Sequence, residues 1–457
     1  MPQVQQRHRS RFISLVTVLL VLLIATACAP PPPAEAPADT GGEAPAAATG
    51  DAASDEVLQV WITWGDNPAQ IQALFDQYGE ATGVQVQVNA PVETDKVIAA
   101  LAGNDPPDIL VTGGPDNVGT WAREDLITPL DDLISTTSID LEDIFDAPLS
   151  QCQYQGAYFC LPWGTDTYAL FWNKDLFEDA GLDPEQPPQT LEELVAMAKE
   201  LTIVADDGTL TQIGFVPDFS WSHLDLYTAM MGGWWYNEDG TELTLTSDAV
   251  VNALLWEQQF YCNDDYAVDE VQRFKSGFGD YSSPDNGFYG GKIAMMVEGE
   301  WQPGPNFIQN YKPELYYGVA PFPYPEADPA RANTSVVSGS TVMIPSSAKN
   351  KEASAELLAW MMSPEVVAEE MVANFNLPSG ATAAQDPRFH ENEKFEVFLN
   401  LMGDPNAVAP VMSPINGEVS TALGQIEEEV LATCADPLPL LEAAQAELQP
   451  LLDAALQ

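Results

Sequence analysis

The segment Val57–Ile62 has the sequence VLQVWI, an apolar run that predicts a β-strand at the start of the folded part of the chain. Asn67 and Pro68 follow as a helix cap and a first-turn proline. Apolar residues then recur at helical spacing until Gly83, a residue typical of a helix end. These features predict a strand followed by a capped helix.

Two more strands and one more helix come next. Valines alternate with polar residues over positions 84–88, which favours a strand, and a short helix is expected over residues 96–102. The run DILV at Asp108–Val111 is typical of a buried parallel strand. The resulting β-α-β-α-β order predicts an α/β fold with right-handed crossovers. Further on, Thr190 with Glu193 predicts a helix start, and Gly208 is expected to end that helix.

The N-terminus resembles a bacterial lipoprotein signal peptide spanning residues 1–27. Arginines at positions 7, 9 and 11 precede the apolar run Phe12–Ala27, and Cys28 follows small residues. The alternative is a transmembrane anchor, but this run is shorter than the roughly 20 residues that span a bilayer. A plain secretory signal is a second alternative. We expect a lipid on Cys28 to anchor the protein to the membrane outside the cytoplasm.

Composition separates a tether from a globular body. Residues 28–55 are rich in Ala and Pro and lack large apolar side chains, which predicts a disordered tether. The remaining residues exceed what one core usually serves and suggest two lobes. The chain has 16 Lys and Arg against 69 Asp and Glu. This charge excludes nucleic acid as a partner and favours neutral or cationic ligands.

The cysteines predict disulfides rather than a metal site. With Cys28 assigned to the lipid, four cysteines remain in an oxidising compartment. Cys152 and Cys160 flank a hairpin-like segment and form the local pair, which leaves Cys262 to pair with Cys434. The histidines are far apart in sequence and show no ligand spacing, so no metal is expected.

Six segments of the chain resemble a known family, and they occur in the order that is typical of that family. The chain resembles the family 1 extracellular solute-binding proteins, the maltose-binding-protein-like binding subunits of ABC importers. The resemblance rests on Pro162–Phe177, Ala180–Asp183, Pro187–Leu194, Gly290–Met296 leading to Gly299-Glu300-Trp301, Tyr317–Pro323 and Ala348–Ala353.

The resemblance implies a two-lobed periplasmic-binding-protein-like fold of type II, with a ligand cleft between the lobes. Residues 56–162 with 318–362 would form lobe 1, and residues 163–317 with 363–457 would form lobe 2. Hinge closure would trap a carbohydrate for an ABC permease in the membrane. The implied protein is a monomer, not an enzyme, and needs no cofactor.

Aromatic side chains next to acids are the expected site residues. Sugars stack their C–H faces on rings, and their hydroxyls need carboxylates and amides as partners. Some candidates follow strand ends, where ligands bind in open α/β sheets. The resemblance supplies others, among them Asp166 and the tryptophan of the Gly-x-Trp motif. The candidates are Trp64, Asp66, Thr112, Asp116, Trp163, Asp166, Tyr168, Asp218, Trp221, Trp235, Trp301 and Ser340.

Other interpretations stay open at this point. A tryptophan is more often a packing residue than a ligand platform, and an acid near a helix start can be a cap. The ligand could be a polyol or a polyamine instead of a sugar. Carboxylates and tryptophans together would also suit a secreted glycosidase, although the sequence contains no hydrolase motif.

Overall fold

The computed structural model describes residues 57–65 and 67–457, and every structural statement below concerns these residues. The predicted signal peptide, Cys28, the tether and Asp66 lie outside them.

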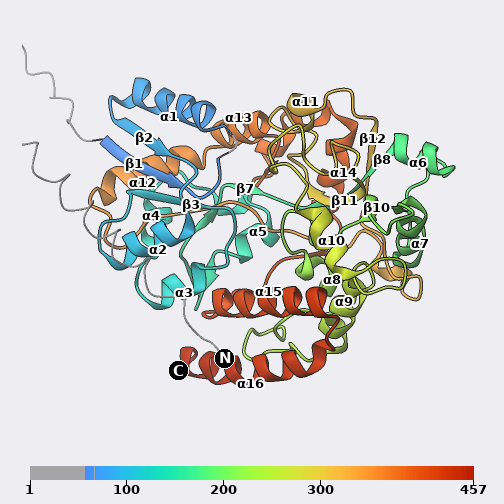
Figure 1. The fold of residues 1–457 in the computed structure, drawn as a ribbon. Helices are drawn as coiled ribbons and strands as arrows, with labels where there is room; N and C mark the ends of the chain where they lie inside the picture. The colour runs from blue at the N-terminus through green and yellow to red at the C-terminus, as the bar shows by residue number, and fades with distance from the viewer. Residues whose placement is uncertain (1–56, 66) are drawn as a thin grey trace, which may run out of the picture. The chain divides into compact units, whose positions relative to one another are not determined.

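The first sheet begins with the predicted parallel strands. Strand β1 (Val57–Ile62) pairs in parallel with β2 (Gln85–Asn89) on one side and with β3 (Ile109–Thr112) on the other, and the three lie side by side in Figure 1. Strand β14 (Thr341–Met343) pairs antiparallel with β3, and β6 (Leu161–Pro162) pairs antiparallel with β14. The strand order of this sheet is β2-β1-β3-β14-β6. The β-α-β-α-β prediction is therefore confirmed.

The first helix shows why the sequence folds locally as predicted. In α1 (Pro68–Thr82) the Asn67 side chain accepts a hydrogen bond from the Gln70 amide at 3.3 Å. Gly83 ends the helix in the left-handed conformation, with φ of 81°. Helix α1 turns its apolar residues, including Phe75, into the core and packs beside β2. The next helix, α2, spans Thr94–Ala102.

The second sheet has the order β12-β8-β11-β10-β9. Strands β10 and β11 are parallel, whereas β11 with β8, β8 with β12 and β10 with β9 are antiparallel. Because β12 pairs with β8, residues up to Ala320 belong to the second sheet. The strands are β8 (Tyr168–Asn173), β9 (Ile203–Val204), β10 (Leu210–Phe215), β11 (Ile293–Gly299) and β12 (Tyr317–Ala320).

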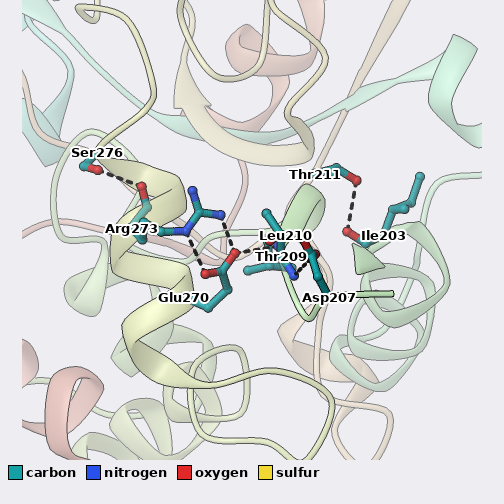
Figure 2. A network of polar contacts seen from close by, with 8 residues as sticks. All are labelled: Ile203, Asp207, Thr209, Leu210, Thr211, Glu270, Arg273 and Ser276. Carbon is teal, nitrogen blue, oxygen red and sulfur yellow. Dashed lines mark hydrogen bonds and ion pairs between the residues drawn. The ribbon is translucent and has the colours of Figure 1, made fainter. Parts of the chain in front are cut away.

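A polar network ties the edge of this sheet to α10 (Val268–Lys275), as Figure 2 shows. The Glu270 carboxylate accepts a hydrogen bond from the Leu210 amide at 2.6 Å and one from Arg273 Nε at 2.7 Å. Gly208, with φ of 85°, lies in the turn between β9 and β10, whereas α7 (Leu191–Leu201) ends before it. The expectation that Gly208 ends this helix is wrong, because the helix ends at Leu201 and Gly208 lies in the turn of the hairpin that follows.

Two disulfides join the pairs that the sequence predicts. Cys152 bonds to Cys160 around the hairpin of β4 (Gln153–Tyr154) and β5 (Ala157–Tyr158). Cys262 bonds to Cys434, which follows α15 (Asn416–Thr433). Helix α15 packs against α16 (Pro437–Ala455), and the two lie side by side in Figure 1. The second bridge therefore fastens these C-terminal helices to the segment after α9 (Asp248–Gln258).

The start of α15 lies against α3 (Val118–Arg123) near the first sheet. A Cβ atom at Gly119 would lie 2.2 Å from the Ser413 carbonyl oxygen, so only glycine allows this backbone approach. Thr120 Oγ1 donates a hydrogen bond to the Pro414 carbonyl oxygen at 3.0 Å. Residues 294 positions apart in sequence thus meet at this contact.

Short elements connect these parts. They are α4 (Asp131–Thr136), α5 (Asp146–Ser150), β7 (Gly164–Thr165), α6 (Lys174–Ala180), α8 (Leu224–Met230), α11 (Ile308–Tyr311), β13 (Ser335–Val336), α12 (Lys351–Met361), α13 (Pro364–Asn374), β15 (Leu377–Pro378), α14 (Glu393–Met402) and β16 (Ala407–Val408), with 3-10 turns at Leu141–Asp143, Pro329–Arg331, Ala383–Gln385 and Pro387–His390.

The two disulfides close loops of very different length, with sequence separations of 8 and 172 residues. In the chain-entropy model, replacing Cys262 and Cys434 by alanine should cost about 5 kcal/mol, and replacing Cys152 and Cys160 about 2.5 kcal/mol. Denaturant unfolding of both double variants would measure the difference. An equal loss in the two variants would contradict this account.

Several carboxyl groups are buried in the core. Burial raises the pKa of Glu427 and of Glu370 to about 7, and it raises the pKa of Glu257 as well. Such a group stabilises the fold below its unfolded pKa near 4.5, and the contribution is lost as the pH rises through its folded pKa. Glu270, whose pKa Arg273 lowers to about 2, acts oppositely but only at more acidic pH. The stability contributed by the buried carboxyls should therefore fall between pH 5 and pH 8.

The exchange Glu427→Gln tests this dependence, because an amide of the same shape does not ionise. We expect the thermal midpoint of the natural protein to fall from pH 5 to pH 8. In the variant this slope should flatten, with a gain on the order of 3 kcal/mol in unfolding free energy at pH 8. Glu428→Gln, at an exposed position of the same helix, is the matched control and should leave the slope unchanged. A midpoint that rises toward pH 8 would refute the prediction.

Candidate ligand-binding site

Five rings from four segments of the chain come together beside the second sheet. We call Tyr168, Trp221, His223, Tyr281 and Trp301 the aromatic cluster. The ring of Trp301 lies 6.2 Å from that of Tyr168 and 6.0 Å from that of Trp221, measured between centroids. Trp221 in turn lies 5.5 Å from Tyr281, and His223 lies 5.1 Å from Tyr168. All but His223 are half-buried, so each of these four rings keeps part of its surface open.

The register of β8 against β11 brings two of these rings together. Tyr168 begins β8 and lies opposite Gly299 at the end of β11, so Trp301 follows two residues beyond that pair. A Cβ atom at Gly299 would lie 2.2 Å from the Trp301 ring. The indole therefore lies directly on the glycine backbone, and a side chain there would displace it.

Hydrogen bonds fix the orientation of the Trp301 ring. Its Nε1 donates to the Tyr281 hydroxyl oxygen at 2.7 Å, and the Tyr281 hydroxyl donates to the Glu298 carboxyl at 3.1 Å. Gln302 adds a second hydrogen bond to the Tyr281 hydroxyl. Glu298 is fully buried, and burial raises its pKa to about 8. These hydrogen bonds hold the Trp301 ring in place.

Two acids, Asp166 and Glu300, lie beside the aromatic cluster. Glu300 is fully buried; burial, reinforced by the charge of Asp166, raises its pKa well above the usual range. Asn376 donates hydrogen bonds to Asp166 at 3.2 Å and to Glu300 at 3.3 Å and so bridges the two groups. Asp166 is half-buried, and its charge adds to the rise in the pKa of Tyr168 that burial causes. The structure therefore places Asp166 next to the aromatic cluster.

Two further carboxyl groups with raised pKa values, Asp116 and Asp225, lie in segments that follow strands of different sheets. Asp116 lies in the loop after β3 of the first sheet, and Asp225 lies in the first turn of α8, after β10 of the second. Burial raises the pKa of Asp225 to about 6, and the charge of Asp116 adds to the rise. Asp116 itself is exposed, although nearby protein withdraws enough water to raise the pKa of its carboxyl. Asn416 donates a hydrogen bond to Asp116 at 3.2 Å.

Sequence reasoning missed Asp225, Tyr281, His223 and Glu300. Only Glu300 had a signal, because it lies inside the Gly299-Glu300-Trp301 motif. Asp225 looks like an ordinary acid in the first turn of a helix, and nothing in the sequence places it near Asp116.

Two predicted site residues have other roles. Trp163 is fully buried, donates a hydrogen bond to the Met361 carbonyl oxygen at 3.2 Å and packs 6.2 Å from Phe75. Trp163 therefore packs in the core. The Asp218 carboxylate forms an ion pair with Lys275 at 2.6 Å and also bonds the Tyr261 hydroxyl. Asp218 is therefore committed to a structural network.

The remaining candidates are only partly available. The Thr112 hydroxyl bonds within the protein to Thr341, at 2.8 Å, and Ser340 is buried with its carbonyl oxygen bonded to the Trp163 amide. Trp64 is half-buried, and its buried Nε1 lacks a hydrogen-bond partner among the residues described. Trp235 is half-buried and stacks on Trp234 with ring centroids 5.5 Å apart. Both tryptophans stay predictions.

Two cavities lie away from the aromatic cluster, near the Cys262–Cys434 disulfide. Their volumes are about 720 Å³ and 550 Å³, and both are lined by Lys199 and Tyr266. Neither includes a residue of the aromatic cluster.

Comparison with known proteins identifies the family. Residues 63–368 match the family described as bacterial extracellular solute-binding protein. The chain belongs to this family. Like its relatives, it has the two-lobed, maltose-binding-protein-like α/β fold. In the part of the chain that the structure describes, no helix is both long and apolar enough to cross a bilayer.

Three similar proteins illustrate the likeness. A maltotriose-binding protein of Pyrococcus abyssi is 21% identical over 377 residues, which cover 80% of this chain and 76% of the relative. The solved structure of CpMnBP1 with mannobiose bound is 28% identical, with a TM-score of 0.78, and the match covers 86% of this chain and 99% of that one. UgpB of Mycobacterium tuberculosis, in complex with glycerophosphocholine, is 21% identical, with a TM-score of 0.70 over 88% of this chain and all of its own.

The close approach between Gly299 and the Trp301 ring can be tested by substitution. Gly299→Ala should force the Trp301 ring away and cost about 1 to 3 kcal/mol of stability through overpacking. Gly424→Ala is the control, because its Cβ would meet no atom within 4 Å inside α15, and helix propensity should stabilise that variant by about 0.5 to 1 kcal/mol. Chemical unfolding measures both changes. Equal effects at the two glycines would count against the packing described.

Proposed function

We propose that the protein is the substrate-binding subunit of an ABC importer and binds a mono- or oligosaccharide. The single observation that supports this most is the aromatic cluster, which offers half-buried ring faces next to carboxylates. Sugar C–H faces lie well on such rings, and sugar hydroxyls donate to carboxylates. The relatives with mannobiose and maltotriose in their names make short oligosaccharides the first ligands to try.

Hinge closure would enclose this ligand between groups from both sheets. We assign the first sheet to lobe 1 and the second sheet with the aromatic cluster to lobe 2, and we place the return to lobe 1 after Ala320. Asp116 would then contribute from lobe 1, and Tyr168, Trp221 and Trp301 from lobe 2. Neither lobe would hold the ligand alone, so binding would shift the population toward a closed form that the permease recognises.

We propose that the protein performs no chemistry on its ligand. Asp116 and Asp225, both with a raised pKa, are the carboxyl groups that a glycosidase could use. The family consists of binding proteins, which favours binding over hydrolysis. Incubating the protein with an oligosaccharide that it binds, followed by chromatography, distinguishes the two: unchanged ligand supports the importer, and shortened product supports the enzyme.

The N-terminal signal supports a location outside the cytoplasm. We propose that a lipid on Cys28 holds the protein at the membrane, where it delivers the ligand to the permease as a monomer. Mass spectrometry of the native protein would detect the lipid on Cys28, and an unmodified cysteine would argue for a secreted form.

Trp301 should carry much of the affinity for sugar. Because an anchoring ring contributes about 2 kcal/mol, Trp301→Ala should weaken binding about 30-fold or more. Titration calorimetry with mannobiose, maltotriose and related sugars first finds a ligand and then compares the variant. Trp61→Ala, which removes a half-buried ring of β1 outside the cluster, is the control. Unchanged affinity in a folded Trp301→Ala protein would show that the ligand binds elsewhere.

A further inference from the structure

The Tyr281 hydroxyl group takes part in three hydrogen bonds next to the Trp301 ring. It accepts from the indole Nε1 of Trp301 at 2.7 Å and from Nε2 of Gln302 at 2.8 Å, and it donates to the Glu298 carboxyl at 3.1 Å. A phenolic hydroxyl has one proton to donate and two lone pairs with which to accept. All three are used, so the hydroxyl has no bonding capacity left for a ligand.

The direction of each hydrogen bond is set by the groups around it. An indole nitrogen can only donate. The amide oxygen of Gln302 accepts from the Tyr289 hydroxyl at 2.5 Å, so the amide nitrogen is the end that faces Tyr281. Burial raises the pKa of Tyr281 well above its usual range, which keeps the proton on the hydroxyl. That one proton must therefore go to the Glu298 carboxyl.

A short closed loop holds the backbone of Tyr281. The Gly279 amide donates to the Asp285 carbonyl oxygen at 2.9 Å, which joins the two ends of the loop. A Cβ atom at Gly279 would lie 2.6 Å from the Asp285 Cβ atom, so glycine permits this approach. Beside the loop, the buried Asn286 side chain donates to the Tyr281 carbonyl oxygen at 2.9 Å. The position of the tyrosine is therefore set by its backbone as well as by its hydroxyl.

The Tyr281 ring also contacts the second tryptophan of the aromatic cluster. Its centroid lies 5.5 Å from that of Trp221 in an edge-to-face arrangement, and 5.3 Å from that of the buried Phe307. The rings of Trp221 and Trp301 are 6.0 Å apart and tilted by 36°. Tyr281 thus contacts one tryptophan through its ring and binds the other through its hydroxyl.

Rings that are already in place serve a ligand better than rings that it must order. Ordering a mobile side chain during binding has an entropic cost that reduces affinity. A tryptophan held by a hydrogen bond before the ligand arrives avoids this cost. Trp221 and Trp301 are half-buried and keep surface for a ligand, whereas the Tyr281 hydroxyl is fully used within the protein. Tyr281 is therefore expected to act on the ligand through the tryptophans.

We propose that Tyr281 is a positioning residue of the sugar site, whose hydroxyl holds the Trp301 indole and whose ring holds Trp221 in the arrangement that stacks on the ligand. This inference rests on the proposed function and adds a determinant of affinity whose hydroxyl does not bind the ligand itself. It involves no chemical step.

A double-mutant cycle tests whether Tyr281 acts through Trp301. Tyr281→Phe removes only the hydroxyl. We expect calorimetry, with whichever of mannobiose, maltotriose and cellobiose binds the natural protein, to show affinity about five- to tenfold lower in this variant. Trp301→Phe keeps a ring but has no N–H group to hold. In that background, adding Tyr281→Phe should change the affinity by less than about twofold.

Tyr266→Phe is the matched control for the loss of a tyrosine hydroxyl. Tyr266 is also half-buried, and its hydroxyl donates to the Phe260 carbonyl oxygen at 3.0 Å, away from the aromatic cluster. This variant should bind sugar as the natural protein does. Thermal melting confirms that each variant is folded.

The indole proton of Trp301 gives a readout that a general loss of stability would not reproduce. In a proton–nitrogen NMR spectrum of the unliganded protein, its signal is identified by its loss in Trp301→Phe and should exchange slowly with solvent. Tyr281→Phe should speed this exchange about tenfold and shift the signal, while the signal of Trp61 in β1 stays in place. Slow exchange in the natural protein can be measured even if Tyr281→Phe proves unstable.

The outcomes separate this inference from the proposed function. Unchanged affinity in Tyr281→Phe, or an equal loss in both Trp301 backgrounds, overturns the positioning role and leaves sugar binding intact. Fast exchange of the Trp301 indole proton in the natural protein overturns it as well. An absence of binding to every saccharide tried overturns the proposed function, and the positioning role falls with it.

Discussion

The antiparallel register between β8 and β11 is the constraint on which the rest of the site depends. It places Tyr168 opposite Gly299, so that the beginning of one strand and the end of the other meet at the same edge of the second sheet. A shift of one residue would turn every side chain of β8 to the other face. Both strands are almost entirely buried, and the hydrophobic contacts on both faces fix this register.

From this pairing the site is built in steps. Gly299 leaves room for the Trp301 ring, and Tyr281 then holds the indole nitrogen. Near them lie the carboxyl groups of Glu298 and Glu300, whose burial raises their pKa and so favours the protonated form. The acidity of the protein therefore has two parts. Most acids are solvated on the surface, whereas a few are buried where their protonation matters to stability.

Local sequence signals predicted much of the fold. They could not predict the roles of residues whose partners lie far away in sequence. The cap at Asn67 and the glycine at Gly83 act within a few residues, and both lie where the sequence places them. Trp163 and Asp218 differ because their partners, Met361 and Lys275, are 198 and 57 residues away. The family motif pointed to Asp166 and Trp301, which stay predicted ligand contacts, whereas no local signal pointed to Asp225.

The contact between α3 and the residues before α15 has a mechanical consequence. Gly119 lies against the Ser413 carbonyl without an intervening side chain, and Thr120 holds the Pro414 carbonyl. A rotation of one sheet relative to the other must either pivot at this contact or break it. Because Asp116 lies close in sequence to Gly119, a rotation about this contact would move that carboxylate less than it would move loops farther away.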